Sequence, residues 1–147
     1  MAFKEEIKSK FDSNQLMAAV NIIYTGNWLR DVSLPIYKKY NILSQHYNIL
    51  RIVNGSYPDS VSPGYIKEVM LDKGRDLTRL VDKLVNLGYV ERSLCKDNRR
   101  KMKIIITKSG TEIIDNIGKE INSLYTSYNL SEEEAIKLSN LLDKLRS

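Results

Sequence analysis

The spacing of apolar residues changes at Gly88, and this change restricts the chain to few folds. Before Gly88, one helix face is marked by apolar residues at i, i+3, i+4, i+7 and i+8, namely Leu77, Leu80, Val81, Leu84 and Val85. After it, Tyr89–Arg92 and the β-branched run Lys101–Thr107 have the character of strands, joined by the polar, basic segment Ser93–Arg100. We therefore predict a helix over Arg75–Leu87, followed by a β-hairpin with a charged tip.

A shorter helix is predicted immediately upstream. Ser62 is an N-cap candidate for a helix over Pro63–Leu71, which begins with proline at the favoured first position. Its expected buried residues are Ile66, Val69 and Met70. The turn Asp72–Gly74 separates it from the next helix. Two helices joined by a short turn and followed by a hairpin form a helix-turn-helix with a wing.

Long helices are predicted before this unit. Apolar residues at helical spacing favour one helix from Lys4 to Tyr37, with a bend near Gly26. A second helix is expected from an N-cap at Ser44 to Asn54-Gly55, where glycine favours an end.

Two further helices are predicted after the hairpin. The first begins at Thr107 or Ser109 and is broken at Asn129. Ser131 and Glu134 form a capping box that opens the second. The residues expected to be buried on that last helix are Ala135, Leu138, Leu141, Leu142 and Leu145. The predicted fold class is α+β, mainly helical, with a winged helix-turn-helix between helical flanks.

The positive charge of the chain is concentrated in its centre. The formal net charge is +5, and Val61–Thr107 holds eleven Lys and Arg against six Asp and Glu, so the remaining residues are neutral in sum. A basic centre between neutral helices favours binding to a polyanion, and the alternative is a generic basic surface.

The helix after the turn supplies the first candidate contacts. The second helix of a helix-turn-helix enters the major groove of DNA with its N-terminal residues nearest the bases. Those residues are Arg75, Asp76, Thr78 and Arg79, while Lys83, one turn later, is expected to reach a phosphate. The alternative is that this face is only the solvated side of an amphipathic helix.

The hairpin tip supplies the second set of contacts. Arg92–Lys103 contains six basic residues and a single acid, Asp97. Such a tip can place arginine in a narrow minor groove, and Asp97 or Asn98 can orient the arginine by hydrogen bonding. The candidate wing residues are Lys96, Asp97, Asn98, Arg99, Arg100 and Lys101.

Several classes of protein lack the residues they need in this sequence. The chain has one cysteine, Cys95, and one histidine, His46, so neither an internal disulfide nor a dedicated zinc site is expected, and no cofactor is predicted. His46 has no evident acidic partner, and there is no glycine-rich phosphate loop, so catalysis is not expected. No apolar run approaches the ~20 residues of a membrane span, and the charged N-terminus favours a cytoplasmic protein.

Four motifs, in order, resemble the signature of MarR-type transcription regulators. They are TRLVDKL at Thr78–Leu84, GYVER at Gly88–Arg92, DNRR at Asp97–Arg100 and ITKSG at Ile106–Gly110. The resemblance covers nearly the whole chain, since that family flanks its winged domain with dimerisation helices. It implies an N-terminal part of the dimerisation region at 1–43, a DNA-binding domain at 44–107 and C-terminal dimerisation helices at 108–147.

The wing departs from the family pattern at one position. The family often has Asp-Arg-Arg nine residues before the threonine, and the count back from Thr107 gives Asn98, Arg99 and Arg100. An Asp-x-Arg alternative is formed by Asp97 and Arg99. Either Arg99 or Arg100 is therefore the candidate for the minor groove.

The resemblance further implies a homodimer that binds double-stranded DNA at pseudo-palindromic half-sites about 34 Å apart, most simply as a repressor. Apolar residues on the first and last helices exceed what a small winged domain needs, which supports dimerisation. The candidate interface residues are Ile7, Phe11, Ile121, Leu138, Leu141 and Leu145.

MarR-type regulators also often bind small aromatic effectors between the dimerisation helices and the winged domain. The residues that could line such a cleft are Tyr24, Trp28, Tyr37, Tyr40 and His46. The alternative is that these side chains serve only in packing.

Two other functions are compatible with a winged helix, namely a protein–protein adaptor and an RNA-binding module. Neither is favoured, because an adaptor does not need a basic wing and RNA binding usually needs exposed aromatic residues.

Overall fold

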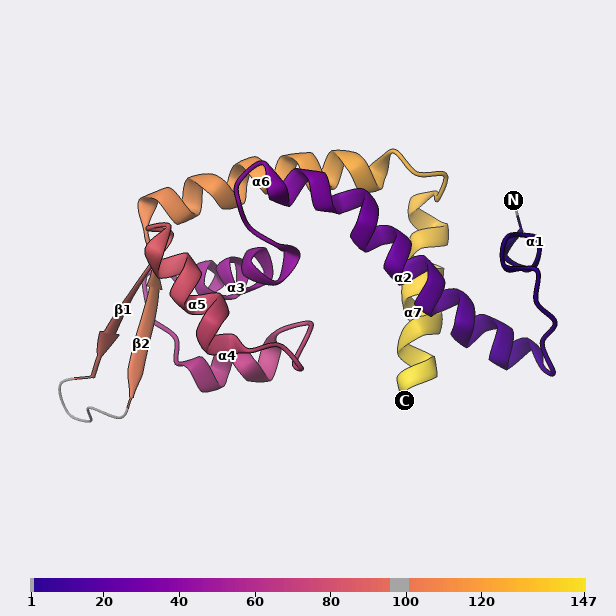
Figure 1. Cartoon of the computed structure of the whole chain (residues 1–147), viewed down its shortest axis with the longest axis horizontal. Coiled ribbons are helices and arrows are strands. Elements are labelled where there is room, and N and C mark those ends of the chain that lie inside the picture. The colour runs from indigo at the N-terminus through magenta and orange to yellow at the C-terminus, as the bar shows by residue number, and fades with distance from the viewer. Residues whose placement is uncertain (1, 96–100) are drawn as a thin grey trace.

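The structure is a computed structural model that describes residues 2–95 and 101–147. The described residues form seven helices and one two-stranded antiparallel sheet (Figure 1). In chain order the elements are α1 (Phe3–Ile7), α2 (Asn14–Lys38), α3 (Ser44–Gly55), α4 (Pro63–Val69), α5 (Leu77–Asn86), β1 (Val90–Leu94), β2 (Met102–Ile106), α6 (Lys108–Thr126) and α7 (Glu132–Arg146). This confirms the predicted fold class, a mainly helical α+β winged helix-turn-helix with helical flanks.

Helix α3 lies at the centre of the core. Its Ile49, Leu50 and Val53 are fully buried. They belong to one apolar cluster with buried residues from each neighbouring element, including Ile66 of α4, Leu84 of α5, Ile104 of β2 and Ile117 of α6. Because one helix is shared by all these contacts, the helix-turn-helix, the wing and the start of α6 pack as one unit.

The helix-turn-helix differs from its prediction at both helix ends. Helix α4 ends at Val69, which is 43% exposed and not buried as expected, because the backbone becomes extended at Met70. Helix α5 begins at Leu77 and not at Arg75, because Asp76 is its N-cap and accepts a hydrogen bond from the Arg79 amide. The apolar stripe was correctly assigned, whereas the start of the helix depends on a cap that periodicity does not reveal.

The wing is the β1–β2 hairpin, in which Val90 lies opposite Ile106 and Leu94 opposite Met102. Val61, in the segment before α4, pairs with Ile104 of β2 through two backbone hydrogen bonds of 2.8 Å. The hairpin is therefore fixed at its base to the helix-turn-helix.

The N-terminal helix is not continuous, contrary to the prediction. The chain leaves α1 at Lys8, which has a positive φ of 51°. Helix α2 then starts with a new cap, as the Ser13 side chain accepts a hydrogen bond of 3.0 Å from the Leu16 amide. Past that cap the helix runs through Gly26 without interruption.

The start of α3 also differs from its prediction. Leu43 and not Ser44 is the N-cap, and its amide donates to Nδ1 of His46 at 2.9 Å. The imidazole at the third helical position therefore accepts the amide of the N-cap residue, and no N-cap side chain accepts an amide of the first turn.

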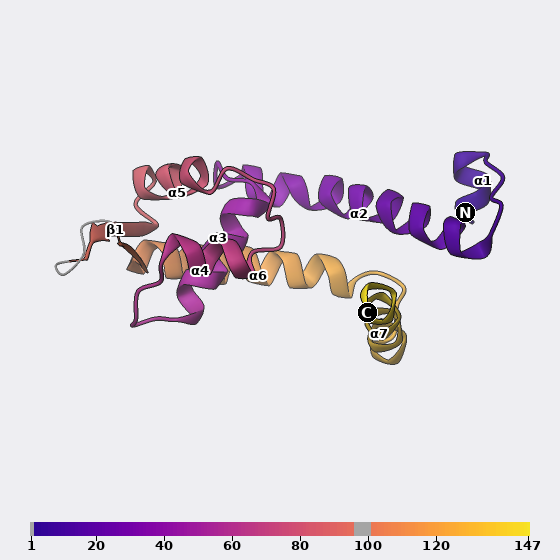
Figure 2. The ribbon, with the colours of Figure 1, turned by 90° about the horizontal axis from the view of Figure 1, so that it is seen from below.

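The C-terminal helices begin as predicted. Thr107 caps α6, and Ser131 with Glu134 forms the capping box of α7. However, no residue of α7 is buried in this single chain, so the expected burial of its leucines is not observed within it. Figure 2 shows α7 turning away at the far end of α6, remote from the winged unit. Among the described residues, no helix has both the length and the apolar character of a membrane span.

Candidate nucleic-acid interface and adjoining cleft

The first turn of α5 presents an arginine to solvent. The Asp76 carboxylate accepts the Arg79 amide at 3.3 Å and lies 3.7 Å from Nε of the same residue. The Arg79 side chain is nevertheless 88% exposed, and Thr78 beside it is exposed as well. Asp76 thus supports the helix start, while Thr78 and Arg79 are available to a partner. Lys83, one turn later, is half-buried.

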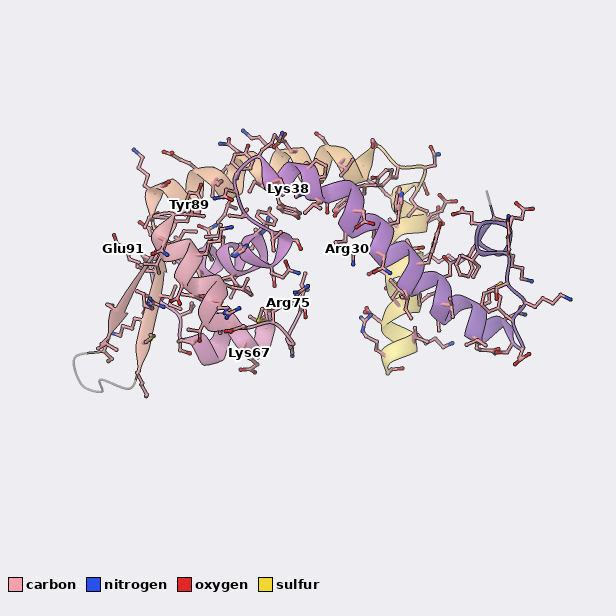
Figure 3. All side chains as sticks on the ribbon, viewed as in Figure 1. Arg30, Lys38, Lys67, Arg75, Tyr89 and Glu91 are labelled. Carbon is pink, nitrogen blue, oxygen red and sulfur yellow. The ribbon has the colours of Figure 1, made fainter. Side chains whose placement is uncertain are left out.

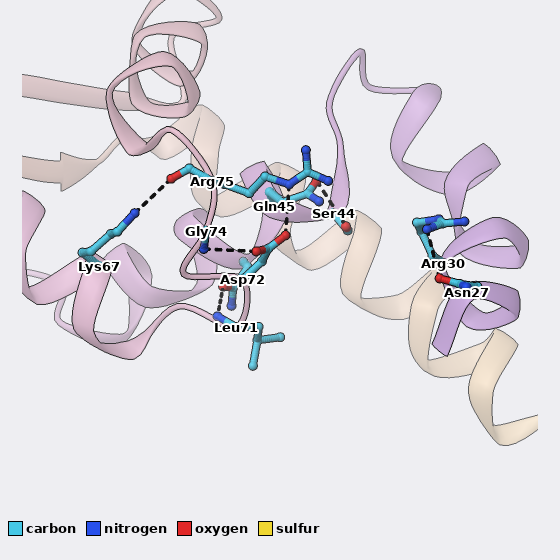
Figure 4. Close-up of polar contacts among 10 residues, drawn as sticks. Asn27, Arg30, Ser44, Gln45, Lys67, Leu71, Asp72, Gly74 and Arg75 are labelled. Carbon is cyan, nitrogen blue, oxygen red and sulfur yellow. Dashed lines mark hydrogen bonds and ion pairs between the residues drawn. The ribbon is translucent and has the colours of Figure 1, made fainter. Parts of the chain in front are cut away.

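Arg75 lies in the turn before α5 and is held by two neighbours. Its Nε donates to the Asp72 carboxylate at 3.0 Å, and its carbonyl oxygen accepts from Nζ of Lys67 at 3.0 Å (Figure 4). This pairing with Arg75 is the main reason that the pKa of Asp72 is lowered. Figure 3 shows Lys67 and Arg75 on the edge of the winged unit formed by α4 and the turn.

A salt bridge that the sequence did not suggest joins α5 to the wing. Nη1 of Arg92 on β1 donates to the Asp82 carboxylate on α5, and the Arg92 side chain is only 28% exposed. Arg92 had been counted with the basic residues of the wing, but its guanidinium braces the hairpin against α5. Both residues lie within the MarR-like motifs, Asp82 in TRLVDKL and Arg92 in GYVER.

The rest of the candidate wing falls largely outside the described residues. Lys101 is described and exposed. The other candidates, Lys96, Asp97, Asn98, Arg99 and Arg100, are not among the residues that the structure describes.

A cleft of about 720 Å³ lies between the long helices α2 and α6 and the winged unit. Among the residues that line it are three tyrosines and two arginines, namely Tyr37, Tyr47, Tyr125, Arg30 and Arg51. The turn after α4 closes one side with Met70, Leu71 and Asp72. Aromatic walls with two cations suit a small aromatic molecule that carries a negative charge.

The five residues predicted to line an effector cleft do not gather in one place. Only Tyr37 lines the large cleft. Tyr24 and Trp28 line a smaller hollow of about 460 Å³ between α1 and α2, where the Tyr24 hydroxyl donates to Glu6 at 2.7 Å, which raises its pKa. The remaining two lie elsewhere, Tyr40 donating to Glu120 at 3.3 Å and His46 capping α3.

The pKa values of two of these side chains, both of them buried, are shifted from their ordinary values. Burial, with a smaller contribution from the neighbouring Tyr125 and Tyr47, raises the pKa of Tyr37 to about 12, so the cleft contains a neutral phenol. Burial, with a smaller contribution from Lys83, lowers the pKa of His46, so its imidazole stays neutral and Nδ1 can accept the Leu43 amide.

The candidate dimer residues are not fully buried, although Ile121 packs against the core of the winged unit and lines the large cleft. Ile7, Phe11 and Ile121 are half-buried. Leu138, Leu141 and Leu145 of α7 are 46%, 57% and 62% exposed. An apolar helix face left this open has no partner within the described part of the chain.

Comparisons with known proteins identify other proteins that have this fold. No profile of a known protein family matches the chain. The HTH-type transcriptional regulator SarZ of Staphylococcus haemolyticus is 28% identical over 92% of this chain and 90% of its own length. A mutant of MarR from E. coli, solved with operator DNA, superposes with a TM-score of 0.74 and 22% identity over 92% of this chain and 99% of that one. The chain has the fold of MarR-family regulators.

A second solved structure with the same fold was captured with a ligand. The organohalide-sensing regulator RdhR, bound to 2,4-dichlorophenol, superposes with a TM-score of 0.78 and 14% identity over 94% of this chain and 85% of that one. The resemblance to MarR-type regulators seen in the sequence is thus confirmed in the fold.

Two of the motifs that carry the MarR resemblance, GYVER and ITKSG, meet at the base of the wing. The Thr107 hydroxyl donates to the Gly88 carbonyl at 2.7 Å and accepts from the Gly110 amide at 3.1 Å. A Cβ on Gly110 would lie 2.2 Å from the Tyr89 carbonyl oxygen, so α6 can lie this close to the residue before β1 only with glycine there. In the MarR-type fold of this chain, these residues join α5, the wing and α6.

Proposed function

We propose that this chain is a transcription regulator that binds specific sequences of duplex DNA as a homodimer, most simply as a repressor on a pseudo-palindromic operator. The observation that carries the proposal is the exposed first turn of α5, with Thr78 and Arg79 facing outward beside a basic hairpin. Arginine can pair with guanine in the major groove, and the basic tip Lys96–Lys101 supplies contacts to the minor groove.

The names of the similar proteins support this reading over the alternatives. SarZ is an HTH-type transcriptional regulator, and the MarR structure holds operator DNA. They are regulators and not enzymes, and we extend that to this chain. An adaptor function does not account for the basic wing, and RNA binding is disfavoured because the polar face of α5, in the residues described, has no aromatic side chain.

The homodimer and the effector complete the proposal. We assign dimerisation to residues 1–43 and 108–147 and DNA binding to residues 44–107, with action in the cytoplasm. The open leucine face of α7 provides the apolar surface for a second copy. The cleft beside Tyr37 would hold a small aromatic effector that releases DNA, as an aromatic compound is bound by RdhR.

Selection from a random pool of duplexes tests the proposal. Purified protein should enrich a pseudo-palindromic sequence, and its affinity for that duplex should exceed that for shuffled duplex by ~10³-fold or more and fall steeply with salt. Equal affinity for enriched and shuffled duplexes would contradict a specific regulator.

A further inference from the structure

The N-cap of α5 brings a negative charge to the surface proposed for DNA. Asp76 lies directly before the first turn of that helix, and its side chain is 61% exposed. One oxygen of its carboxylate accepts the Arg79 amide at 3.3 Å, and the other oxygen lies 3.7 Å from Nε of the same arginine. An exposed carboxylate opposes contact with a polyanion, so its place here calls for a role that outweighs this repulsion.

Helix capping by itself does not require a carboxylate. Serine, asparagine and aspartate cap helices about equally well. Among the helices in the described residues, α5 alone has a carboxylate as its side-chain cap. The side chains that cap α2, α4, α6 and α7 are hydroxyl groups, namely those of Ser13, Ser62, Thr107 and Ser131. The negative charge of Asp76 is therefore available for a role other than capping.

That charge acts on the guanidinium of Arg79. The Arg79 side chain is 88% exposed, so the ion pair with Asp76 is weak in water. A bound duplex displaces water and lowers the local dielectric constant, which strengthens the attraction. Because the carboxylate lies beside Nε, the two Nη groups at the outer end can donate together to O6 and N7 of one guanine.

The same carboxylate disfavours the other contact that Arg79 could make. A long arginine side chain can also turn to a phosphate, and that contact carries no sequence information. A phosphate beside Arg79 would lie close to the Asp76 carboxylate as well, and the two negative charges repel each other. The edge of a guanine has no net charge and meets no such repulsion. Asp76 thus penalises the sequence-independent contact more than the base contact.

We propose that Asp76 is a positioning residue for Arg79, which orients the guanidinium toward a guanine and keeps it from the phosphates. This rests on the proposed DNA-binding function and adds to it how α5 gains selectivity at one base pair. A cap alone and a positioning charge have opposite consequences. Loss of a cap weakens binding to every duplex, whereas loss of the charge with the cap retained should strengthen binding to unrelated DNA and reduce selectivity.

The test uses the full-length protein with the enriched duplex and a shuffled duplex, measured by fluorescence anisotropy. Asp76→Asn and Asp76→Ser both keep a capping oxygen and remove the charge. Each should bind the shuffled duplex more tightly than wild type does. The ratio of affinities for the enriched and shuffled duplexes should fall by about 10-fold, which corresponds to one good base contact. Added to Arg79→Ala, Asp76→Asn should cause no further loss of this ratio. Urea unfolding midpoints confirm that the variants fold.

Asp143→Asn is the matched control, because Asp143 also forms an exposed ion pair with an arginine three residues later, Arg146 of α7. It removes the same charge and should leave the affinity ratio unchanged. The proposal is overturned if the Asp76 variants keep the wild-type ratio, if they bind both duplexes more weakly, or if the control lowers the ratio as much. Failure of the wild-type protein to enrich any duplex would instead reject the proposed function.

Discussion

Thr107 forms hydrogen bonds with the backbone of Gly88, Tyr89 and Gly110. These close contacts restrict which residues can occupy the neighbouring positions. The Thr107 amide donates to the Tyr89 carbonyl at 3.1 Å, and its hydroxyl links Gly88 to Gly110. Gly88 itself has a φ of 78°, a conformation that favours glycine. The residue types at Gly88, Thr107 and Gly110 are therefore explained by backbone conformation and by contacts between segments, and not by helix or strand propensity.

Replacing Gly110 with Ala should therefore destabilise the fold by about 1–3 kcal/mol, since the new Cβ would meet a backbone oxygen that cannot move alone. Chemical denaturation measures the change. Gly26→Ala is the control, because a Cβ there has nothing within 4 Å and alanine should stabilise α2 by about 0.5–1 kcal/mol. Equal effects of the two substitutions would contradict the role given to Gly110.

Arg79 is the residue for which specificity is most directly tested. Arg79→Ala should cost ~1–3 kcal/mol in binding of the enriched duplex and relax the preference at one base position. Arg146→Ala removes another exposed arginine paired with a carboxylate, on α7, and should leave DNA binding unchanged. A uniform loss across all sequences would mark Arg79 as a phosphate contact.

At the scale of elements, the base of the wing has a structural role, whereas its tip is proposed to contact DNA. Its base is fixed by the Val61–Ile104 pairing and the Arg92–Asp82 salt bridge. Because these contacts hold the base, we expect that the basic residues of the tip can be replaced without unfolding the domain.

Replacing both Arg99 and Arg100 with Ala should weaken binding to all duplexes and flatten the dependence of affinity on salt. The matched control is the double variant Lys137→Ala with Lys144→Ala, which removes the same charge from α7. If this control changes affinity and salt slope as much as the wing variant, net charge and not the wing is responsible.

The sequence predicted elements better than it predicted their ends. Five apolar residues on one face were enough to place α5, but its start depends on the Asp76 side chain reaching the Arg79 amide. The break between α1 and α2 was missed because the apolar stripe continues across it, although Ser13 is a good cap. Local patterns reveal burial, whereas caps and breaks depend on individual hydrogen bonds.

The candidate site was predictable only in part, for the same reason. Residues of the exposed α5 face follow from helix geometry alone. The cleft does not, because its walls come from α2, α3, α6 and the turn after α4. Of the five aromatic and histidine candidates only Tyr37 lines it, and Arg30, Arg51 and Asp72 were not singled out for it. Residues distant in sequence meet there, and no spacing rule relates them.

At the scale of the whole molecule, the described part of the chain is elongated and leaves the apolar face of α7 uncovered. Helices α2 and α6 project from the winged unit, and α7, with its exposed leucines, lies at the far end of α6 (Figure 1). A single chain exposes this apolar surface to water, which disfavours a monomer.

Leu141→Glu combined with Leu145→Glu should convert the proposed dimer to a monomer, as measured by analytical ultracentrifugation, because two charges would be buried without partners. Ile136→Glu is the control. Its side chain is 63% exposed, much like the 62% of Leu145, but it projects from the opposite side of α7. Dissociation by the control alone would place the interface on the other face of the helix.

Helix α6 connects the base of the wing to α7, so its length relates a rotation at one end to a displacement at the other. Its 19 residues span about 28 Å, from the base of the wing to the start of the α7 arm. A tilt of about 7° at one end of a rod of that length displaces the other by about 3.4 Å, the rise of one base pair along each DNA strand. In the proposed dimer, a rotation of this size where two copies meet would therefore shift each winged unit along DNA by about one base pair.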